Sequence, residues 1–249
     1  MSMASRAEIC VTACAEMFRD AGEIMVSPMT TVVGVGARLA RLTFAPDILL
    51  TDGEARLLAD TPAIGAAGAI EGWMPFHRVF ETLAWGRRHV VMGANQIDRY
   101  GNQNISAFGP LQQPTRQMFG VRGAPGNTIN HATSYFVGNH STRVFADAVD
   151  VVSGIGYDKI DADNPAYRFV DIHRVVSNLG VFDFGGPGNT MRALSLHPGV
   201  SAAEVAEKTS FPVAGLDGAE ETRPPTEDEL TLIREVIDPQ SLRDKEVRS

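Results

Sequence analysis

The strongest local pattern in the chain is an apolar run that ends in a polar turn: His89-Val90-Val91-Met92-Gly93-Ala94-Asn95-Gln96-Ile97-Asp98-Arg99-Tyr100-Gly101-Asn102-Gln103-Asn104. A short β-branched run that stops at turn-forming residues predicts a buried strand from about His89. Ligands bind at the carboxyl ends of strands in open α/β sheets, so Asn95, Gln96 and Asp98 are placed to face a ligand. The same residue types also build ordinary hairpins, which local chemistry alone favours.

Two segments resemble the β subunits of family I coenzyme A transferases. The first matches the family pattern Gln-hydrophobic-Asp-x-x-Gly-Asn at Gln96-Ile97-Asp98 and Tyr100-Gly101-Asn102. The second resembles the family's carboxyl-terminal signature and comprises His173-Arg174-Val175-Val176-Ser177-Asn178-Leu179-Gly180-Val181-Phe182-Asp183-Phe184, His197-Pro198-Gly199-Val200 and residues 204–209. The resemblance is closest to the glutaconate transferase branch, and within it to β subunits of actinobacterial hydrolases that cleave a steroid ring.

The resemblance implies a fold, a partner and a reaction. The fold is α/β, with an open and mostly parallel sheet flanked by helices. The partner is a homologous α subunit, in an α2β2 heterotetramer. The reaction is hydrolytic carbon–carbon cleavage of a bicyclic steroid remnant carried as an acyl-CoA, in cholesterol breakdown. Coenzyme A is part of the substrate, so no separate cofactor is expected, and the resemblance allows the catalytic base to come from the α subunit.

The residues after the predicted strand 47–50 bear on the choice between transfer and hydrolysis. They are Thr51-Asp52-Gly53-Glu54. Transferases of the family carry a Glu-x-Gly motif here, whose glutamate attacks the acyl-CoA carbonyl. If Gly53 is the matching glycine, Thr51 occupies the nucleophile's position, and its hydroxyl forms only a stable ester. A shift in register would place Asp52 or Glu54 there, so both are candidate acid or base groups, although strand-end residues also suit a plain turn.

Two other functions fit the same residues. One is a glutaconate-type coenzyme A transferase in which Asp52 or Glu54 is the nucleophile. The other is a non-catalytic acyl-CoA-binding scaffold subunit, because a shared fold does not imply catalysis. A new acyl-CoA formed from a free acid would favour the first, and binding without turnover would favour the second.

Residues 107–130 contain many turn formers and little periodicity, which predicts a long loop that is functional or covered by a partner. Residues 123–127 resemble the family's glycine-rich loop, whose backbone amides help to hold the thioester oxygen. An oxyanion needs amide donors at about 3 Å, and glycine allows that approach. Pro125 has no amide hydrogen, so Gly126 and Asn127 are the predicted donors, with Gln96 as a further substrate-binding residue. An ordinary Gly-Pro surface loop is an equally good interpretation.

The composition limits the class of protein. The 249 residues, 44% of them hydrophobic, suffice for one large α/β domain, which we expect to span residues 1–249 with a loosely held tail from about Pro239. The net charge of -8 argues against a nucleic-acid surface. We find no signal peptide and no apolar run of about 18 residues, so we expect no membrane contact and a cytoplasmic location.

Capping patterns and periodicity predict helices over residues 6–20, 76–84, 201–208 and 226–236, and strands over residues 23–26, 47–50, 143–152, 169–184 and 191–196. Cys10 and Cys14 lie one turn apart on the first helix and are expected to be buried and reduced. His131 and His140 lack acidic or cysteine partners at metal-ligand spacing, so no metal site is predicted.

Overall fold

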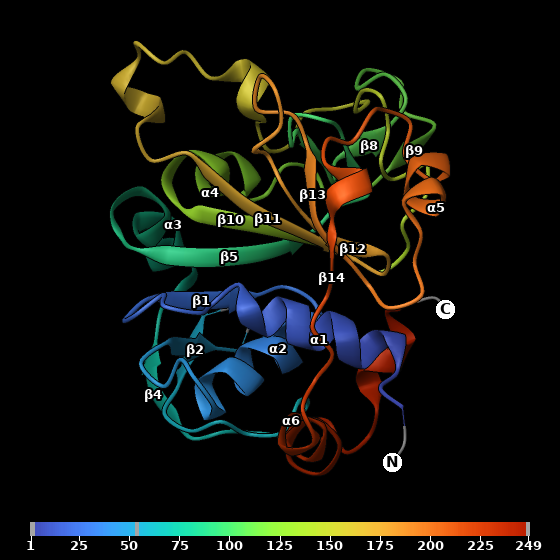
Figure 1. Ribbon diagram of the computed structural model, residues 1–249. Helices are drawn as coiled ribbons and strands as arrows, with labels where there is room; N and C mark the ends of the chain where they lie inside the picture. Colours follow the sequence, from blue (N-terminus) through green and yellow to red (C-terminus); the bar gives the residue numbers. More distant parts are fainter. Residues whose placement is uncertain (1–2, 53–54, 248–249) are drawn as a thin grey trace.

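A computed structural model describes residues 3–52 and 55–247. Their centre is a ten-stranded sheet of order β14-β13-β12-β11-β10-β5-β1-β2-β3-β4 (Figure 1). The strands are β1 Met25–Pro28, β2 Leu49–Thr51, β3 Arg56–Leu58, β4 Ile70–Trp73, β5 Arg88–Gly93, β6 Gln96–Ile97, β7 Gln103–Asn104, β8 Ala107–Phe108, β9 Arg116–Gln117, β10 Ala132–Val137, β11 Asp171–Ser177, β12 Gly180–Asp183, β13 Arg192–Leu196 and β14 Glu220–Glu221. The helices are α1 Arg6–Glu16, α2 Thr31–Leu42, α3 Phe76–Trp85, α4 Ala124–Asn130, α5 Ala202–Glu207 and α6 Glu227–Thr231, which continues as a π-helical turn over Leu232–Ile237. Within this described part of the chain, no helix is long and apolar enough to cross a membrane.

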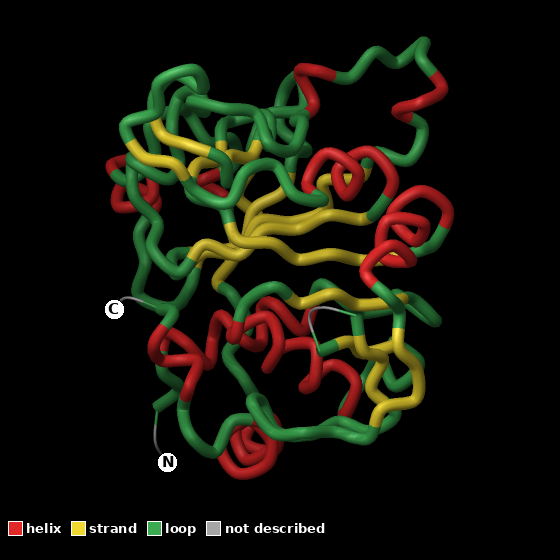
Figure 2. The backbone as a smooth tube through the Cα atoms, turned by 180° about the vertical axis from the view of Figure 1, so that it is seen from behind, coloured by secondary structure: helices red, strands yellow, loops and turns green. Residues whose placement is uncertain are grey.

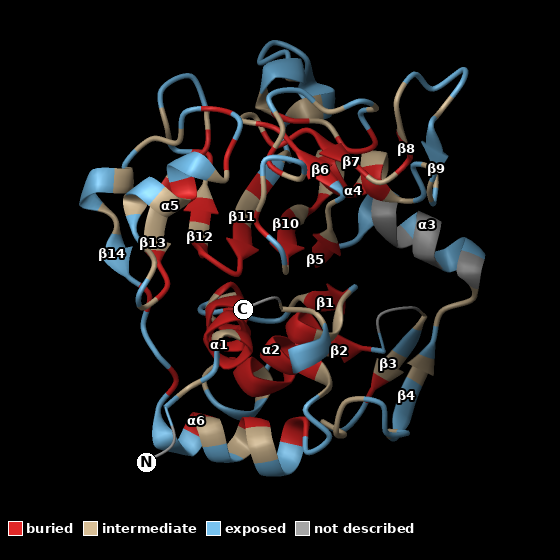
Figure 3. Ribbon diagram, turned by 90° about the vertical axis from the view of Figure 1, so that its right-hand side faces the viewer, coloured by how far each residue is buried: buried red, intermediate tan, exposed pale blue. Residues whose placement is uncertain are grey.

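Strands β11, β10, β5, β1 and β2 run parallel, and antiparallel strands extend the sheet on both sides. This arrangement confirms the predicted open and mostly parallel sheet. Helices α1 and α2 cover one face, and α3 and α4 lie on the other (Figure 1, Figure 2). Successive side chains of a strand point to opposite faces, so Val90 and Val91 enter different apolar cores. Strands buried on both faces (Figure 3) are continuous apolar runs in sequence, which makes residues 89–92 recognisable.

Helices α1 and α2 pack closely on each other. The predicted capping box begins α1: the Ser5 amide donates to Glu8 Oε2 at 2.8 Å, and the Glu8 amide donates to the Ser5 hydroxyl at 3.2 Å. A Cβ on Gly36 of α2 would come within 2.9 Å of the Cys14 Cβ, so only glycine permits this approach. Both Cys10 and Cys14 are free thiols with no exposed surface, as predicted, and burial raises the pKa of Cys10 to about 12.

Several predicted elements differ from the structure. Helix α1 ends early, because residues 17–20 form a turn in which Asp20 has a left-handed backbone. Strand β1 includes Pro28, which is tolerated at the strand end. The predicted strand over residues 143–152 is wrong. Only Phe145 is buried in that segment, and Asp150 accepts a hydrogen bond from the Gly109 amide at 2.8 Å, so polar contacts with other loops replace a ladder.

The residues after Pro239, which we expected to be loosely held, make buried contacts with α1 and with Asp238. Arg243 is 4% exposed and lies 2.9 Å from the Asp238 carboxylate and 3.0 Å from the Glu8 carboxylate. Burial by itself would raise the pKa of Glu8, but the hydrogen bonds and charges of Arg234 and Arg243 hold it at about 2. Periodicity does not reveal such ion pairs, because they join residues far apart in sequence.

The tail also caps α2. The Thr31 amide donates to Glu246 Oε1 at 2.7 Å, and the Val32 amide donates to Oε2 at 2.8 Å. A carboxylate suits this position, because the first amides of a helix lack partners and the helix dipole is positive there. The Glu246 carbonyl packs against Gly138, where an added Cβ would lie only 1.9 Å away.

Candidate functional site

The parallel strands end at one edge of the sheet, which we call the carboxyl edge: β2 at Thr51, β1 at Pro28, β5 at Gly93, β10 at Val137 and β11 at Ser177. After β1 the chain passes through α2 to β2, whereas after β5 it continues to β10 on the other side. The direction of winding therefore reverses between β1 and β5. Open α/β sheets bind ligands at such a reversal, so the carboxyl edge is the candidate site.

The end of β2 presents no obvious nucleophile at Thr51. This residue has no exposed surface, and its hydroxyl donates to the Val26 carbonyl at 2.9 Å. Asp52 is exposed and closes a turn: its amide donates to the Arg56 carbonyl at 3.1 Å, and its Oδ1 accepts from the Arg56 amide at 3.2 Å. Gly53 and Glu54 lie outside the described residues. The Thr51 side chain is thus buried within the sheet, whereas Asp52 is exposed at the carboxyl edge.

The turn after β5 is a tightly bonded hairpin. Gln96 is 7% exposed, and its Oε1 accepts from Asn104 Nδ2 at 2.6 Å and from the Asp150 amide at 3.0 Å. Asp98 accepts from Asn102 Nδ2 at 2.8 Å, and burial raises its pKa. Asp98 and Asn102 therefore stabilise the hairpin. The side-chain carbonyl oxygen of Gln96 already accepts hydrogen bonds from other residues of the chain.

Residues 124–130 are helical, which corrects the predicted open loop. Pro125 favours a helix start because its fixed φ suits the first turn. The Asn127 amide donates to the Gly123 carbonyl at 2.9 Å inside this helix, so it is not presented as an oxyanion donor. Asn127 is buried, and its Oδ1 accepts from Arg88 Nη1 at 3.1 Å. Gly126 is the third residue of α4, and its role as a donor stays a prediction.

A buried hydrogen-bond chain lies behind the ends of β10 and β11. The Thr209 hydroxyl donates to the Val205 carbonyl at 2.7 Å, so it accepts from His140 Nε2 at 2.9 Å. His140 Nδ1 then accepts from the Ser177 hydroxyl at 2.9 Å. Burial lowers the pKa of His140 to about 3, which keeps the ring neutral. A serine bonded to an imidazole resembles a nucleophile and its base, but Ser177 is fully buried and instead braces the strand ends.

A cavity of about 150 Å³ lies at the carboxyl ends of β10 and β11. Its walls come from α1, from the residues after β10 and β11, and from α5 and the turn before it, and include Arg6, Asn139, Asn178, Val200, Glu204 and Lys208. Across residues 3–52 and 55–247, no group of three or more His, Cys, Asp and Glu side chains is arranged to hold a metal ion.

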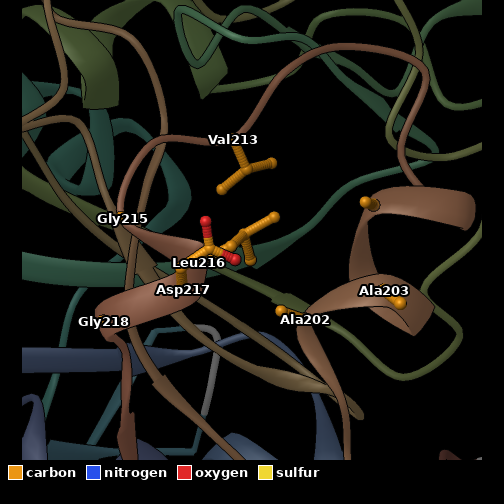
Figure 4. Close-up of a pocket in the computed structure, with 8 residues that line it drawn as sticks. Ala202, Ala203, Val213, Gly215, Leu216, Asp217 and Gly218 are labelled. Atoms are coloured by element: carbon orange, nitrogen blue, oxygen red, sulfur yellow. The ribbon is translucent and has the colours of Figure 1, made fainter.

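A larger cavity of about 430 Å³ lies between α5 and the short helix Leu216–Gly218 (Figure 4). Ala202, Ala203, Val213 and Leu216 form much of its wall, and Asp217 is the ionisable residue in its lining. Such a lining offers few directed polar contacts, so we assign it no chemistry.

No family model matches the chain. The IpdB subunit of the cholesterol ring-cleaving hydrolase of Mycobacterium tuberculosis (strain ATCC 25618 / H37Rv) is 78% identical over 250 residues, which cover 99% of this chain and 100% of that protein. The chain belongs to the IpdB family. The IpdB subunit of Rhodococcus jostii (strain RHA1) is 72% identical over 98% of this chain and 96% of its own length.

Solved structures agree with this membership of the IpdB family. The crystal structure of Rhodococcus jostii RHA1 IpdAB superposes with a TM-score of 0.97 at 70% identity, covering 100% of both chains. Glutaconate coenzyme A-transferase from Acidaminococcus fermentans superposes with a TM-score of 0.83 at 22% identity, over 99% of this chain and 98% of that chain, and shares the fold. The resemblance to the coenzyme A transferase β subunits is therefore confirmed.

The sequence did not single out the residues that meet at the smaller cavity. Asn178, residues 197–200 and residues 204–209 belong to the family signature quoted above, but their convergence with Arg6 and Asn139 depends on the strand order. The signature was the available signal for an IpdB-family site there. It lacked the information that the ends of β10 and β11 lie beside the start of α1.

Proposed function

We propose that the chain is the B-type subunit of a cholesterol ring-cleaving hydrolase and acts with a homologous A-type subunit. The observation that carries this proposal is 78% identity, across essentially the whole chain, to an IpdB subunit of that hydrolase. The Rhodococcus jostii structure is of IpdAB, which supports an A-type partner. We further propose an α2β2 heterotetramer, a cytoplasmic location and a substrate that is a bicyclic steroid remnant carried as a coenzyme A thioester.

The proposed reaction opens a ring between two carbonyl groups. Water adds to the ring ketone, and the tetrahedral intermediate collapses by breaking the bond to the carbon between the carbonyls. The electron pair leaves as an enolate that takes up a proton, and the cleaved carbonyl becomes a carboxylic acid. This route needs a base for the water and donors for the enolate oxygen, and no covalent enzyme intermediate. Coenzyme A takes part only as a portion of the substrate.

The chain's own residues support hydrolysis over transfer. The transferase route requires an exposed carboxylate at the nucleophile's position, and Thr51 instead offers a buried hydroxyl bonded to Val26. Asp52 and Glu54 are the chain's candidate acid or base groups, with the base otherwise supplied by the A-type subunit. Gly126 is the candidate amide donor, and Gln96 supports the turn beside the site.

Isotope labelling tests this proposal. The complex of both subunits would receive the coenzyme A thioester of a cyclic β-diketone in ¹⁸O-labelled water, with a free acid present as a possible acceptor. We expect one labelled oxygen in a new carboxylate and no acyl-CoA of the added acid. Acyl-CoA made from that acid would establish a transferase, and tight binding without turnover would establish a scaffold.

A further inference from the structure

The cavity of about 150 Å³ is where distant family-signature segments meet. Asn178 follows β11, and Val200, Glu204 and Lys208 belong to the segment after β13. Arg6, at the start of α1, closes the other side. The cavity lies on the carboxyl edge, along which the candidate site also lies.

The cavity carries a cation without a counter-ion. Arg6 Nη2 donates to the Pro198 carbonyl at 2.9 Å, whereas Nη1 is buried and has no hydrogen-bond partner. Within the described chain, Arg6 forms no ion pair with a carboxylate. Arg6 is also the first residue of α1, where the helix dipole disfavours a cation. A buried donor without an acceptor is unfavourable, and a bound anion would supply the acceptor.

A second cation reinforces the positive charge. Lys208 Nζ lies 2.7 Å from Glu204 Oε1, one helical turn earlier. Two cations and one carboxylate leave a net charge of about +1 in the lining, because neutral His140 adds none. The chemistry of the lining therefore selects an anion.

The cavity, of about 150 Å³, has room for a small anion such as a phosphate group. Lysine and arginine bind phosphate oxygens through charge-assisted hydrogen bonds.

We propose that this cavity binds a phosphate group of the coenzyme A portion of the substrate, an inference that rests on the proposed function. Four interstrand spacings of about 4.8 Å separate β2 from β11, or about 19 Å along the carboxyl edge. An acyl-CoA carries its thioester and its phosphates at opposite ends of a long flexible arm. The thioester then lies near the end of β2, and the phosphate lies beside Arg6 and Lys208.

The test uses the complex of both subunits with Arg6→Gln and Lys208→Gln, and Lys159→Gln as the matched control. Lys159 also pairs with a neighbouring acid, Asp158, but is outside the cavity lining. Inhibition constants are measured for coenzyme A and for pantetheine, which lacks the phosphates, and binding of inorganic phosphate is measured by calorimetry. We expect each cavity variant to weaken inhibition by coenzyme A about tenfold, as for one charge-assisted hydrogen bond, and to leave inhibition by pantetheine unchanged.

Each of the other possible outcomes would contradict a specific part of the proposal. Equal weakening of coenzyme A and pantetheine would mean a structural effect, and unchanged coenzyme A inhibition would remove the phosphate from this cavity. If phosphate binding depends on Arg6 and Lys208 but coenzyme A inhibition does not, the cavity binds a free anion and the link to the substrate fails. If the wild-type complex has no ring-cleaving activity but coenzyme A binding shows the expected dependence, the proposed function fails and the cavity assignment stands.

Discussion

If Gly53 is the glycine of the family's Glu-x-Gly motif, Thr51 occupies the position of the transferase nucleophile. A carboxylate at this position conserves the energy of the thioester, whereas the Thr51 hydroxyl is buried and engaged with the Val26 carbonyl. Its neighbour Asp52 is exposed and bonded in a turn. In that register the chain offers no carboxylate at this position, which favours hydrolysis over transfer within a shared fold.

Thr51→Val should leave hydrolysis within about tenfold of wild type, because the hydroxyl faces the sheet; loss of an acid or base group typically costs about 10² to 10⁴ in rate. The lost hydrogen bond should lower the free energy of unfolding by about 1 kcal/mol. Steady-state kinetics of the complex and mass spectrometry of peptides covering residues 51–54 check this. A coenzyme A adduct on Asp52 or Glu54 would restore the transferase interpretation.

Buried neutral histidines should make stability depend on pH. Burial lowers the pKa of His140 to about 3 and of His197 to about 4, from an ordinary value of 6.5. Below pH 6.5 these histidines bind protons in the unfolded chain but stay neutral in the folded chain until the pH nears their lowered pKa. Each histidine's contribution is therefore complete above pH 6.5 and falls by up to about 1.4 kcal/mol per pH unit as the pH drops toward the folded pKa.

His140→Gln should flatten that decline, because glutamine keeps a donor and an acceptor but does not titrate. Denaturant unfolding of the complex at a series of pH values from 7.5 to 4.5 gives the slope directly. His77→Gln, at an exposed position of α3, is the control. A His140 variant whose slope equals that of wild type would contradict this explanation.

At the scale of elements, Glu246 forms part of the carboxyl edge. The Glu246 carboxylate caps α2, which begins at the reversal between β1 and β5, and the Glu246 carbonyl packs on Gly138. Ligands of open α/β sheets bind beside such a helix start. The tail, residues 239–247, therefore stabilises the start of α2 and lies beside the candidate site.

Glu246→Gln and Gly138→Ala should each loosen the tail. The first weakens a helix cap worth about 0.5 to 2 kcal/mol, and the second places a methyl group where the Glu246 carbonyl lies. We expect faster proteolysis within residues 239–247, and a double variant little worse than Gly138→Ala, since both changes act on contacts of the same residue, Glu246. Gly218→Ala is the control, because a Cβ there meets nothing within 4 Å. A tail that stays undisturbed in Gly138→Ala would contradict the close packing of the Glu246 carbonyl on Gly138.

At the scale of the whole molecule, large apolar side chains remain on the surface. Trp85, Phe119 and Trp73 are 89%, 72% and 69% exposed. These residues lie at the end of α3, after β9 and at the end of the edge strand β4, and exposed apolar surface of this kind marks interaction sites. Such a surface suits a subunit that works in a complex.

The chain alone should therefore aggregate or exchange between states, whereas co-expression with an A-type subunit should give a stable complex with the mass of two subunits of each kind. Size-exclusion chromatography with light scattering measures this mass. Turnover should require both chains. A monodisperse B-type chain with full activity on its own would refute the prediction.

The sequence by itself determined the elements whose signals are local. Residues 90–92 are a continuous apolar run, as suits a strand that is buried on both faces, and Ser5 with Glu8 caps α1 through contacts three residues apart. The family signature was also legible, because its residues stand in a fixed order along the chain. Those signals were enough for the parallel sheet and for the family.

Only the tertiary structure decided which distant residues meet. The Arg243–Glu8 ion pair, the Glu246 cap on α2 and the convergence of Arg6, Asn178 and Lys208 all depend on strand order. Charge pairs and cavities form between segments far apart in sequence. Local periodicity describes only neighbouring residues, so it cannot predict such contacts. The same limit applies to Thr51, whose type is evident from the sequence but whose burial against Val26 follows from the pairing of β1 with β2.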